Sequence, residues 1–540
     1  MATPASTPPV GSATGLQAES AWKPLRLKMF RWIWLATLVS NIGTWMQTVG
    51  AQWLLVGHAH ASALVALVQT ATTLPVLLFA LPAGVLADVV DRRRLLIGSQ
   101  VFQTVVAGAM AVLSARGGLN PAVLLGLTFL LGCGATFSLP AQQAIIPELV
   151  PRTDLAAASA LGGMNQNLAR AIGPALAGAA VARLGASAVF ALNAASFVVF
   201  AIVLAAWRRP RTTDDVPERL GAALRAGTRY IRHSPVLRRI LLAAGLFVVP
   251  ASAVWALLPV VASHRLGLGP GGYGVLLGAL GVGAVGGAVA LPRLRAGLSD
   301  ARMLLLAFCT YAAVMVAIAS TRTTPVVALL LVPAGVAWIA VLATVNAEMQ
   351  LFLPGWVRAR GLSIYQVVLL GGMAVASAGW GLVAEWSGLS GALLIAGGLL
   401  ALSAVGLLRW PLADVGHLDR SPAIYWPEPH LVVDPDPEAP VMVSVTYTVA
   451  PENVPAFLEA MERVRRSRRR TGAVRWELYR DGEDPRRFVE LFLVRSWDEH
   501  LRQHGGRLTG TDRDVEAAAT ALAEGPTVIA HLFPARPEPD

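Results

Sequence analysis

The chain has 540 residues, of which 55% are hydrophobic and only 14% are charged. Because a soluble globular chain carries about 25% charged residues, this composition excludes an ordinary soluble protein and indicates a membrane protein. A net charge of +11 could suggest nucleic-acid binding, but most of the basic residues before residue 410 stand in short gaps between apolar runs. The sequence therefore predicts a lipid bilayer, and no nucleic acid, as its surroundings.

The first 409 residues predict a bundle of membrane-spanning helices. Residues 1–22 are rich in Ala, Ser, Thr and Pro, and we expect a disordered cytoplasmic N-terminus there. A span needs about 20 apolar residues. The apolar segments that meet this length predict twelve spans, near 31–57, 61–87, 95–115, 120–146, 155–182, 186–207, 237–263, 271–292, 302–320, 325–350, 361–385 and 389–409.

The longest polar gap, 208–236, is predicted to be a cytoplasmic linker, and it divides the spans into two six-helix halves, 23–207 and 237–409. Alternate loops carry 23 Lys and Arg on one side of the bilayer and four on the other. The positive-inside rule then predicts that both termini are cytoplasmic. We expect a multi-pass protein of the inner (plasma) membrane.

The amino-acid composition of the chain changes after Arg409. Residues 410–439 form a predicted Pro-rich linker, and residues 440–534 contain equal numbers of Arg and acidic residues. Alternating and helical patterns predict a strand over 441–449, a helix over 454–464, strands over 474–478 and 488–494, one helical stretch over 497–523 and a strand over 528–533. The predicted fold is thus all-α and polytopic, followed by a small α+β ferredoxin-like domain.

A short polar stretch between the second and third spans contains Gly84, Asp88, Asp91, Arg92 and Arg93. Their placement resembles the cytoplasmic signature loop of the major facilitator superfamily of transporters. The D-x-x-D-R-R-R version found here is similar to the transmembrane secretion effector branch, which includes enterobactin-exporter-like proteins.

Other stretches resemble the same branch: Ser40–Gln47, Leu139–Gln143, Arg170–Pro174 and Pro354–Gly361. The resemblance implies that the loop around Asp88 is a conformational latch between the halves. The alternative is a cluster that only orients the protein in the membrane.

Several polar residues within or near the spans are candidate functional residues. Arg170 lies near the middle of the fifth predicted span, where a charge costs about 2.5–3.5 kcal/mol on insertion scales and therefore usually faces a cavity or a partner. It could bind an anionic substrate or pair with a carboxylate, or it could make a structural hydrogen bond with a helix carbonyl. The uncharged candidates for the transport pathway, which could instead join helices, are Asn41, Gln47, Gln143, Asn346 and Gln350.

Two of these residues suggest an internal duplication, because Gln143 with Pro147 and Leu155 repeats the spacing of Gln350 with Pro354 and Leu362. Glu348 is the candidate for ion coupling. The chain contains no G-x-x-x-x-G-K-[ST] loop, so ATP is not the expected energy source.

The C-terminal unit resembles antibiotic biosynthesis monooxygenase-like domains, which form dimeric α+β barrels; Trp497, Asp498, Glu499 and His500 carry part of the likeness. The resemblance implies a possible homodimer through residues 440–534. Trp497, His500 and His504 could mark an enzyme pocket, although a catalytically silent domain is the alternative. We expect no cofactor and no metal.

Together these features favour a secondary active transporter, driven by an ion gradient (most plausibly protons), which exports a small amphipathic molecule such as a siderophore-like metabolite or a drug by alternating access. Two alternatives stay open at this point: a membrane-tethered, cofactor-independent monooxygenase, and a sensor that does not transport.

Overall fold

The computed structural model describes residues 22–208, 227–412, 418–426, 429, 431–432 and 435–535. The predictions for residues 1–21, for 209–226 of the linker and for parts of 410–439 lie outside the described residues. The same holds for a few side chains within the described helices, among them that of Asp88.

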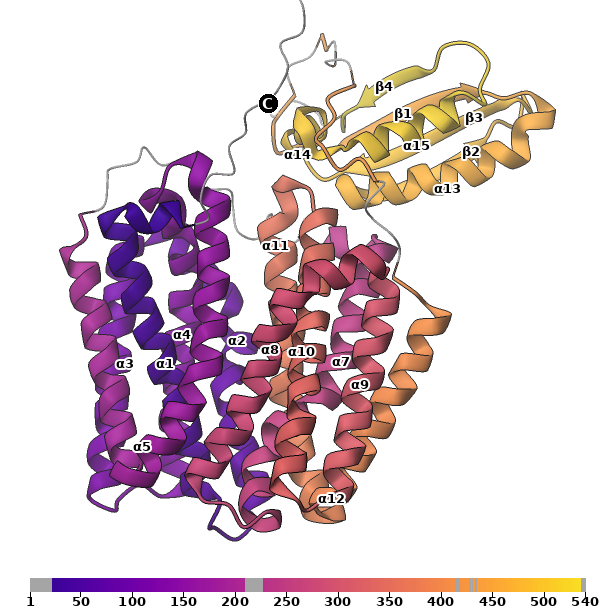
Figure 1. Ribbon diagram of the computed structural model, residues 1–540. Helices are drawn as coiled ribbons and strands as arrows, with labels where there is room; N and C mark the ends of the chain where they lie inside the picture. Colours follow the sequence, from indigo (N-terminus) through magenta and orange to yellow (C-terminus); the bar gives the residue numbers. More distant parts are fainter. Residues whose placement is uncertain are drawn as a thin grey trace, which may run out of the picture.

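Two groups of long helices stand side by side (Figure 1). After the short 3-10 helix η1 (Lys23–Arg26), the first group consists of α1 (Lys28–Leu55), α2 (Ala61–Val89), α3 (Arg92–Ala115), α4 (Pro121–Leu149), the turn η2 (Arg152–Asp154) and α5 (Leu155–Ala206). The second group consists of α7 (Pro235–Val260), η3 (Val261–Arg265), α8 (Pro270–Gly297), α9 (Asp300–Ser320), α10 (Thr324–Phe352), α11 (Gly355–Gln366), η4 (Val367–Gly371) and α12 (Gly372–Arg409).

Nine helical segments among the described residues are long and apolar enough to cross a bilayer. Two of them are much longer than one crossing requires, because the 52 residues of α5 would extend about 78 Å if straight. Gly185 in α5 and Gly388 in α12 interrupt the helical conformation with φ values of 79° and 73°. Such backbone conformations favour glycine, which has no Cβ to clash.

Both ends of α5 lie at the same end of the bundle. Lys23, just before α1, pairs with Asp154 at 3.0 Å, immediately before α5 begins. Arg93, at the start of α3, donates from Nε to the carbonyl of Leu204 at 2.9 Å, close to where α5 ends. The chain therefore reverses at Gly185. We call the end of the bundle that carries Arg92–Arg94 the basic end, and the end that carries Gly185 the opposite end.

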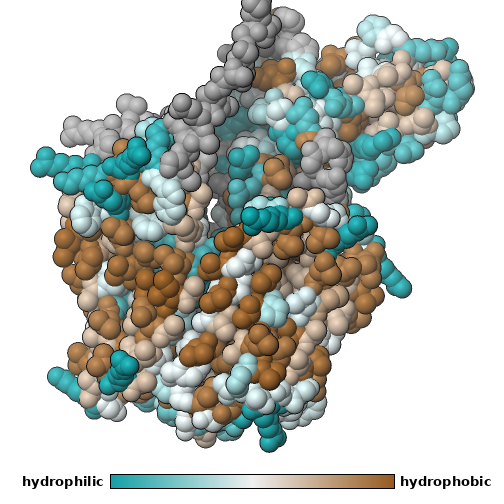
Figure 2. All heavy atoms as spheres, in the orientation of Figure 1, coloured by the Kyte–Doolittle hydropathy of each residue, from teal (hydrophilic) through white to brown (hydrophobic). Residues whose placement is uncertain are grey.

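Hydrophobic side chains form a broad band around the helices on the face seen in Figure 2, with hydrophilic residues gathered at the two ends of the bundle. Large apolar residues of the long helices are exposed, such as Leu382 and Leu402 of α12, each 67% exposed. Exposed apolar side chains on helices long enough to cross a bilayer are typical of a surface covered by lipid.

The two groups contact each other through glycines. A Cβ at Gly178 of α5 would lie 2.9 Å from the Cα of Gly274 in α8, and a Cβ at Gly281 of α8 would lie 2.8 Å from the Cα of Ala171. Helices in a bilayer gain little from hydrophobic burial, so close backbone approach at small residues is what holds them together. Larger side chains at these positions would separate α5 from α8.

The C-terminal unit contains one antiparallel sheet with the strand order β2-β3-β1-β4. Helices α13 and α15 cover one face of the sheet (Figure 1). Along the chain the elements are β1 (Val441–Thr448), η5 (Pro451–Asn453), α13 (Val454–Thr471), β2 (Ala473–Arg480), β3 (Arg487–Val494), α14 (Trp497–Arg502), η6 (Gln503–Arg507), α15 (Gly510–Thr520) and β4 (Val528–Leu532).

The prediction of one helical stretch over 497–523 is wrong. The structure has α14, the π-helical turn η6 and α15 in its place, and the interruption falls at Gly505 and Gly506. Gly506 adopts φ 108°, which ends a right-handed helix. Thr509 then opens α15 with a capping box in which its side chain and Asp512 exchange hydrogen bonds with the backbone.

The C-terminal unit docks on the basic end of the second group. Trp356, at the start of α11, donates from its indole nitrogen to the carbonyl of Arg507 at 3.1 Å, and the guanidinium of Arg507 lies 4.9 Å from the Trp356 ring centroid. Arg229, in the helical segment 227–232, forms an ion pair with Glu499 of α14. Although burial opposes the shift, Arg229 and Arg507 hold the pKa of Glu499 below its usual value.

A buried charge network organises the core of the C-terminal unit. Arg468 of α13 is 4% exposed, and its Nε lies 3.0 Å from Oε1 of Glu490 on β3. Its second partner is Glu516 of α15, at 2.5 Å. Trp476 and Tyr447 also donate to Glu490, at 2.8 and 3.0 Å. The single guanidinium thus joins the helices to the sheet.

Replacing Arg468 by Met should destabilise the C-terminal unit by about 3–5 kcal/mol, because two carboxylates would be left buried without their cation. Hydrogen exchange of the β1 and β3 amides in the full-length protein would measure the loss. The matched control is Arg465→Met, since Arg465 pairs with Glu462 on the exposed side of α13 and should cost at most about 1 kcal/mol. Equal exchange in the two variants would contradict the network's structural role.

Candidate functional site

A cluster of one arginine and three tryptophans lies where the two groups meet. The guanidinium carbon of Arg170, on α5, is 5.8 Å from the ring centroid of Trp45 on α1. Trp45 is 5.9 Å from Trp255 of α7, and Trp255 is 5.4 Å from Trp338 of α10, centroid to centroid. A small cavity between the groups is lined by Arg170, Pro174, Trp255, Leu277, Gly281 and Trp338.

Three nitrogen donors of this cluster are buried without a hydrogen-bond partner among the described residues. They are Nε of Arg170 and the indole nitrogens of Trp255 and Trp338. A buried donor left unsatisfied costs about 1–3 kcal/mol, so three around one cavity are an expensive arrangement unless something else supplies acceptors. Hydrogen-bond acceptors of a bound molecule would satisfy these three donors. The indole rings of the cluster would make apolar contact with the same molecule.

Of the predicted site residues, the structure brings Arg170 alone into this cluster. Sequence reasoning missed Trp45, Trp255 and Trp338. Trp45 stands within the Ser40–Gln47 motif, so its position was visible, but no periodicity in one sequence says that α1, α7 and α10 meet.

Asn41 and Gln47 join helices of the first group. Asn41 donates to Asn165 at 2.9 Å, which links α1 to α5. Gln47 donates to the sulfur of Met110 at 3.1 Å and accepts a hydrogen bond from Asn193, which links α1 to α3 and to the end portion of α5. Their described contacts therefore fit the alternative reading as helix-joining residues.

The remaining predicted pathway residues lie toward the basic end. Gln143 of α4 and Gln350 of α10 are exposed, and Asn346 is half-buried. Glu348, the candidate for ion coupling, is buried on α10, where it is 5% exposed. It occupies the same helix as Trp338, about 15 Å further along at 1.5 Å per residue.

In the polar loop, Asp91 caps α3 by accepting a hydrogen bond from the backbone N–H of Arg94 at 2.9 Å. Arg92 pairs with Glu148 of α4 at 2.8 Å. Arg93 caps the carbonyl end of α5, where a cation is favoured by the helix dipole. Among the described residues, a Cβ at Gly84 would meet no atom within 4 Å.

Hydrogen bonds between the groups lie at the opposite end and in the middle of the bundle, where the hydroxyl of Thr70 on α2 donates to the carbonyl of Ala374 on α12 at 2.8 Å. His60, just before α2, lies 3.1 Å from a carboxylate oxygen of Glu385 on α12, and the other oxygen of Glu385 accepts from the backbone N–H of Ala63 at 3.3 Å. The hydroxyl of Tyr273 on α8 donates to Gln52 of α1 at 2.7 Å. At the basic end, Figure 2 shows a hollow between the two groups on the face drawn, below the C-terminal unit.

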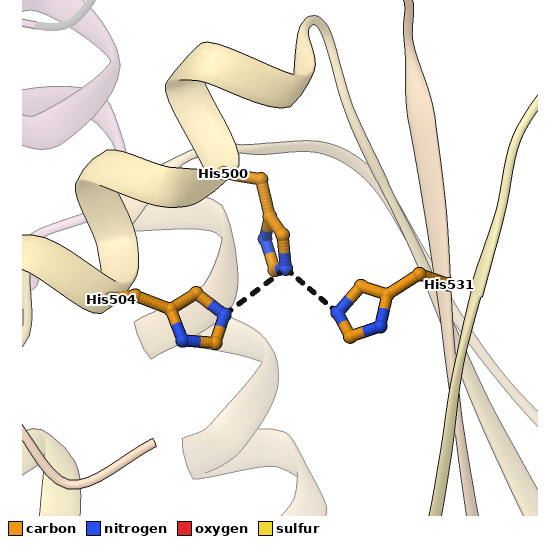
Figure 3. Close-up of side chains that lie close together, drawn as sticks. All are labelled: His500, His504 and His531. Atoms are coloured by element: carbon orange, nitrogen blue, oxygen red, sulfur yellow. Dashed lines mark hydrogen bonds between the residues drawn. The ribbon is translucent and has the colours of Figure 1, made fainter. Parts of the chain in front are cut away.

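In the C-terminal unit, Trp497, His500 and His504 are brought together, and His531 of β4 joins them (Figure 3). Trp497 packs against both His500 and His531, with ring centroids 5.4 and 5.7 Å away. His500 is 1% exposed, and burial lowers the pKa of His500 to about 3, so its ring is neutral at physiological pH.

Comparison with known proteins now adds to these observations. The family model described as transmembrane secretion effector matches residues 19–537, a range that includes the C-terminal unit. The multidrug efflux pump Tap of Mycolicibacterium fortuitum is 27% identical over 402 residues, which cover 71% of this chain and 93% of that protein. Macrolide efflux protein A of Streptococcus pyogenes is 22% identical over 249 residues, covering 46% of this chain and 60% of that protein.

Solved structures share the fold of the helical part. A bacterial homologue of the human lysosomal transporter Spinster, in an inward-facing and unoccupied conformation, aligns with a TM-score of 0.55 at 16% identity, covering 72% of this chain and 95% of that chain. An auto-inhibited peptide transporter of the POT family aligns with a TM-score of 0.58 at 12% identity, covering 71% and 96%. With a match over nearly its whole length, the chain belongs to the transmembrane secretion effector family of major facilitator superfamily transporters.

Proposed function

We propose that this protein is a secondary active exporter that binds a small amphipathic molecule at the Arg170 cluster and moves it by alternating access. The observation that carries the proposal is the set of three unpartnered donors among aromatic rings, placed between the two groups of helices. A molecule with an apolar body and carbonyl, carboxylate or catecholate oxygens would satisfy them. Siderophore-like metabolites and oxygen-rich drugs have this character.

The proposed direction of transport, export, is based on the names of related proteins. Two of the relatives reported above, Tap and macrolide efflux protein A, have efflux in their names. A staphyloferrin A transporter of Staphylococcus aureus is 26% identical over 172 residues, covering 32% of this chain and 43% of that protein. Since the sequence contains no phosphate-binding loop for ATP, we propose a proton gradient as the energy source. Glu348 is the proposed coupling residue, because it is the buried carboxylate on the helix that carries Trp338.

The described arrangement supports an inward-facing conformation in a bilayer whose cytoplasmic side is the basic end. Hydrogen bonds between the groups, such as His60 with Glu385 and Thr70 with Ala374, lie at the opposite end and in the middle of the bundle, whereas a Cβ at Gly84, near the basic end, would meet no described atom within 4 Å. In the outward-facing conformation the second group would close over α2 near Gly84. The loop residues Asp88, Asp91, Arg92 and Arg93 would then act as the latch.

We also propose the finer organisation of the chain. Counting two crossings in each of the segments that reverse at Gly185 and Gly388, and adding α1, turns the nine candidate spans into twelve, in two six-helix halves. An even number keeps both termini on the cytoplasmic side of the inner membrane. The order of elements in the C-terminal unit fits a ferredoxin-like domain.

A homodimer through the C-terminal unit is part of the proposal. The sheet face opposite α13 and α15 carries apolar side chains, with Met442 between Leu493 and Leu532 in register. Leu532 and Val528 are 52% and 64% exposed, and a second copy would cover them. Among the described residues, no contact favours the alternative of a monooxygenase.

Replacing Arg170 by Gln should weaken substrate binding about 10- to 150-fold, the value of losing a charge-assisted hydrogen bond of about 1.5–3 kcal/mol. The measurement is transport of fluorescent amphipathic anions, neutral compounds and cations by proteoliposomes under an imposed pH gradient. Arg183→Gln is the control, because Arg183 is exposed at the opposite end. Transport that does not depend on the pH gradient would contradict proton coupling. Equal transport by the two variants would contradict substrate binding at Arg170.

Replacing Asp88 by Asn should reduce transport at least tenfold with unchanged expression, since a latch that loses about 1.4 kcal/mol of charge pairing shifts its equilibrium by that factor. The same proteoliposome assay measures it. Asp300→Asn is the matched control: Asp300 is a carboxylate at the basic end of the second group, 3.8 Å from Arg295. If Asp88→Asn transports as well as the control variant, the loop only orients the protein.

A further inference from the structure

Three imidazoles from separate parts of the C-terminal unit converge on one point (Figure 3). His500 lies on α14, His504 on η6 and His531 on β4. Nε2 of His500 is 3.3 Å from Nε2 of His504 and 3.0 Å from Nε2 of His531. One ligand atom from each of the three rings lies within 4.8 Å of the others.

The two distances from His500 suit ligands around one small cation, and His504 and His531, whose ligand atoms lie within 4.8 Å of each other, would close on the ion as it binds. A zinc–imidazole bond is about 2.0–2.1 Å long, so two nitrogens on a tetrahedral ion stand about 3.3–3.4 Å apart. The two nitrogen–nitrogen distances from His500 come within about 0.3 Å of that value. Imidazole is also the ligand that zinc, copper, nickel and iron ions accept readily.

The protonation of His500 can be assigned from its neighbours. Thr471 donates its hydroxyl proton to the carbonyl of Ser467 at 3.0 Å, so it accepts from the amide nitrogen of Gln503 at 3.3 Å. The amide oxygen of Gln503 therefore faces Nδ1 of His500, at 2.9 Å, and Nδ1 must carry the proton. Nε2 of His500 is left with one lone pair, directed toward His504 and His531.

One lone pair cannot serve two neighbours equally, whereas a metal ion would bind all three Nε2 atoms at once. A ring N–H donated to a fixed carbonyl oxygen is the usual support of a metal-bound histidine, and Gln503 provides it here. Aromatic rings pack against the cluster: Trp426 is centred 4.9 Å from His504, and Trp497 is centred 5.4 Å from His500.

We propose that His500, His504 and His531 form a binding site for a divalent transition-metal ion of the zinc type. Three neutral imidazoles leave a fourth tetrahedral position, which water or an anion would occupy. The site is separate from the Arg170 cluster and does not depend on the proposed transport function. It also revises the expectation of a chain without a metal.

The three histidines lie next to the residues that attach the C-terminal unit to the second group of helices. Glu499 and Arg507, which contact Arg229 and Trp356 of the transporter part, lie in the same segment as His500 and His504. An ion bound to this segment and to β4 would fix the docking segment against the sheet. Metal occupancy would therefore strengthen the attachment of the C-terminal unit to the second group.

The test is a titration of the full-length protein, without an oligohistidine tag, in detergent after removal of metals with a chelator. The probes are Co²⁺, whose visible absorption reports tetrahedral coordination, and Zn²⁺ in competition. We expect one equivalent bound per chain. His531→Ala and His504→Ala should each weaken binding at least about 100-fold, and Gln503→Ala about 10- to 100-fold, the range for loss of a supporting hydrogen bond.

The matched control is His58→Ala, because His58 is an exposed histidine at the opposite end of the bundle and should bind like the unchanged protein. Hydrogen exchange provides a second measurement: Zn²⁺ should slow exchange over residues 497–507 in the unchanged protein and not in His531→Ala. That comparison also shows whether the variant is folded. Binding that is absent, or equal in His531→Ala, His504→Ala and His58→Ala, would overturn the proposal.

Discussion

The close backbone contact between α5 and α8 is the constraint on which the rest of the arrangement depends. Gly178 and Gly274 meet so closely that a side chain on either would collide with the other helix. In lipid, where apolar side chains gain nothing by leaving the solvent, such contacts can hold two helical groups together without locking them. The contact lies toward the opposite end, so in the proposed alternating access motion about it would open or close the basic end.

The contact between Gly178 and Gly274 also determines how far Arg170 lies from the second group. It stands eight residues before Gly178 on α5, about 12 Å toward the basic end. A cation there is shielded from lipid by Trp45 and by the second group, and its Nε has no acceptor among the described side chains. If the proposed site binds substrate, the same helix provides both the point of contact and the charge that the substrate neutralises, and binding would then be coupled to the relative position of the groups.

Local signals in the sequence were enough for some features. The lengths of apolar runs predicted the helices, the Asp-Arg pattern identified the loop before α3, and the cost of an intramembrane charge singled out Arg170. The strands of the C-terminal unit followed from alternation, as in Val441–Thr448. The prediction of one helical stretch over 497–523 was wrong for a reason that is also local, because Gly505 and Gly506 interrupt the helix.

Other features depend on contacts between distant parts of the chain and could not be predicted. Trp255 of α7 and Trp338 of α10 join the Arg170 cluster only because the packing of the two groups brings all three side chains to one cavity. The bonds of Gln47 to Met110 and Asn193 likewise join segments far apart in the chain. His531 lies 27 residues after His504 in the sequence, and sheet pairing between β1 and β4 is what brings it to the other histidines.

The most direct test of the account is a pair of distance measurements between spin labels in lipid. In a protein without Cys133 and Cys309, one pair replaces Arg94 and Arg358 at the basic end, and another replaces His58 and Arg322 at the opposite end; all four are exposed. Alternating access about the α5–α8 contact predicts that addition of a transported compound, or of acid, shortens the first distance while lengthening the second. Two distances that stay fixed, or that change in the same direction, would contradict it.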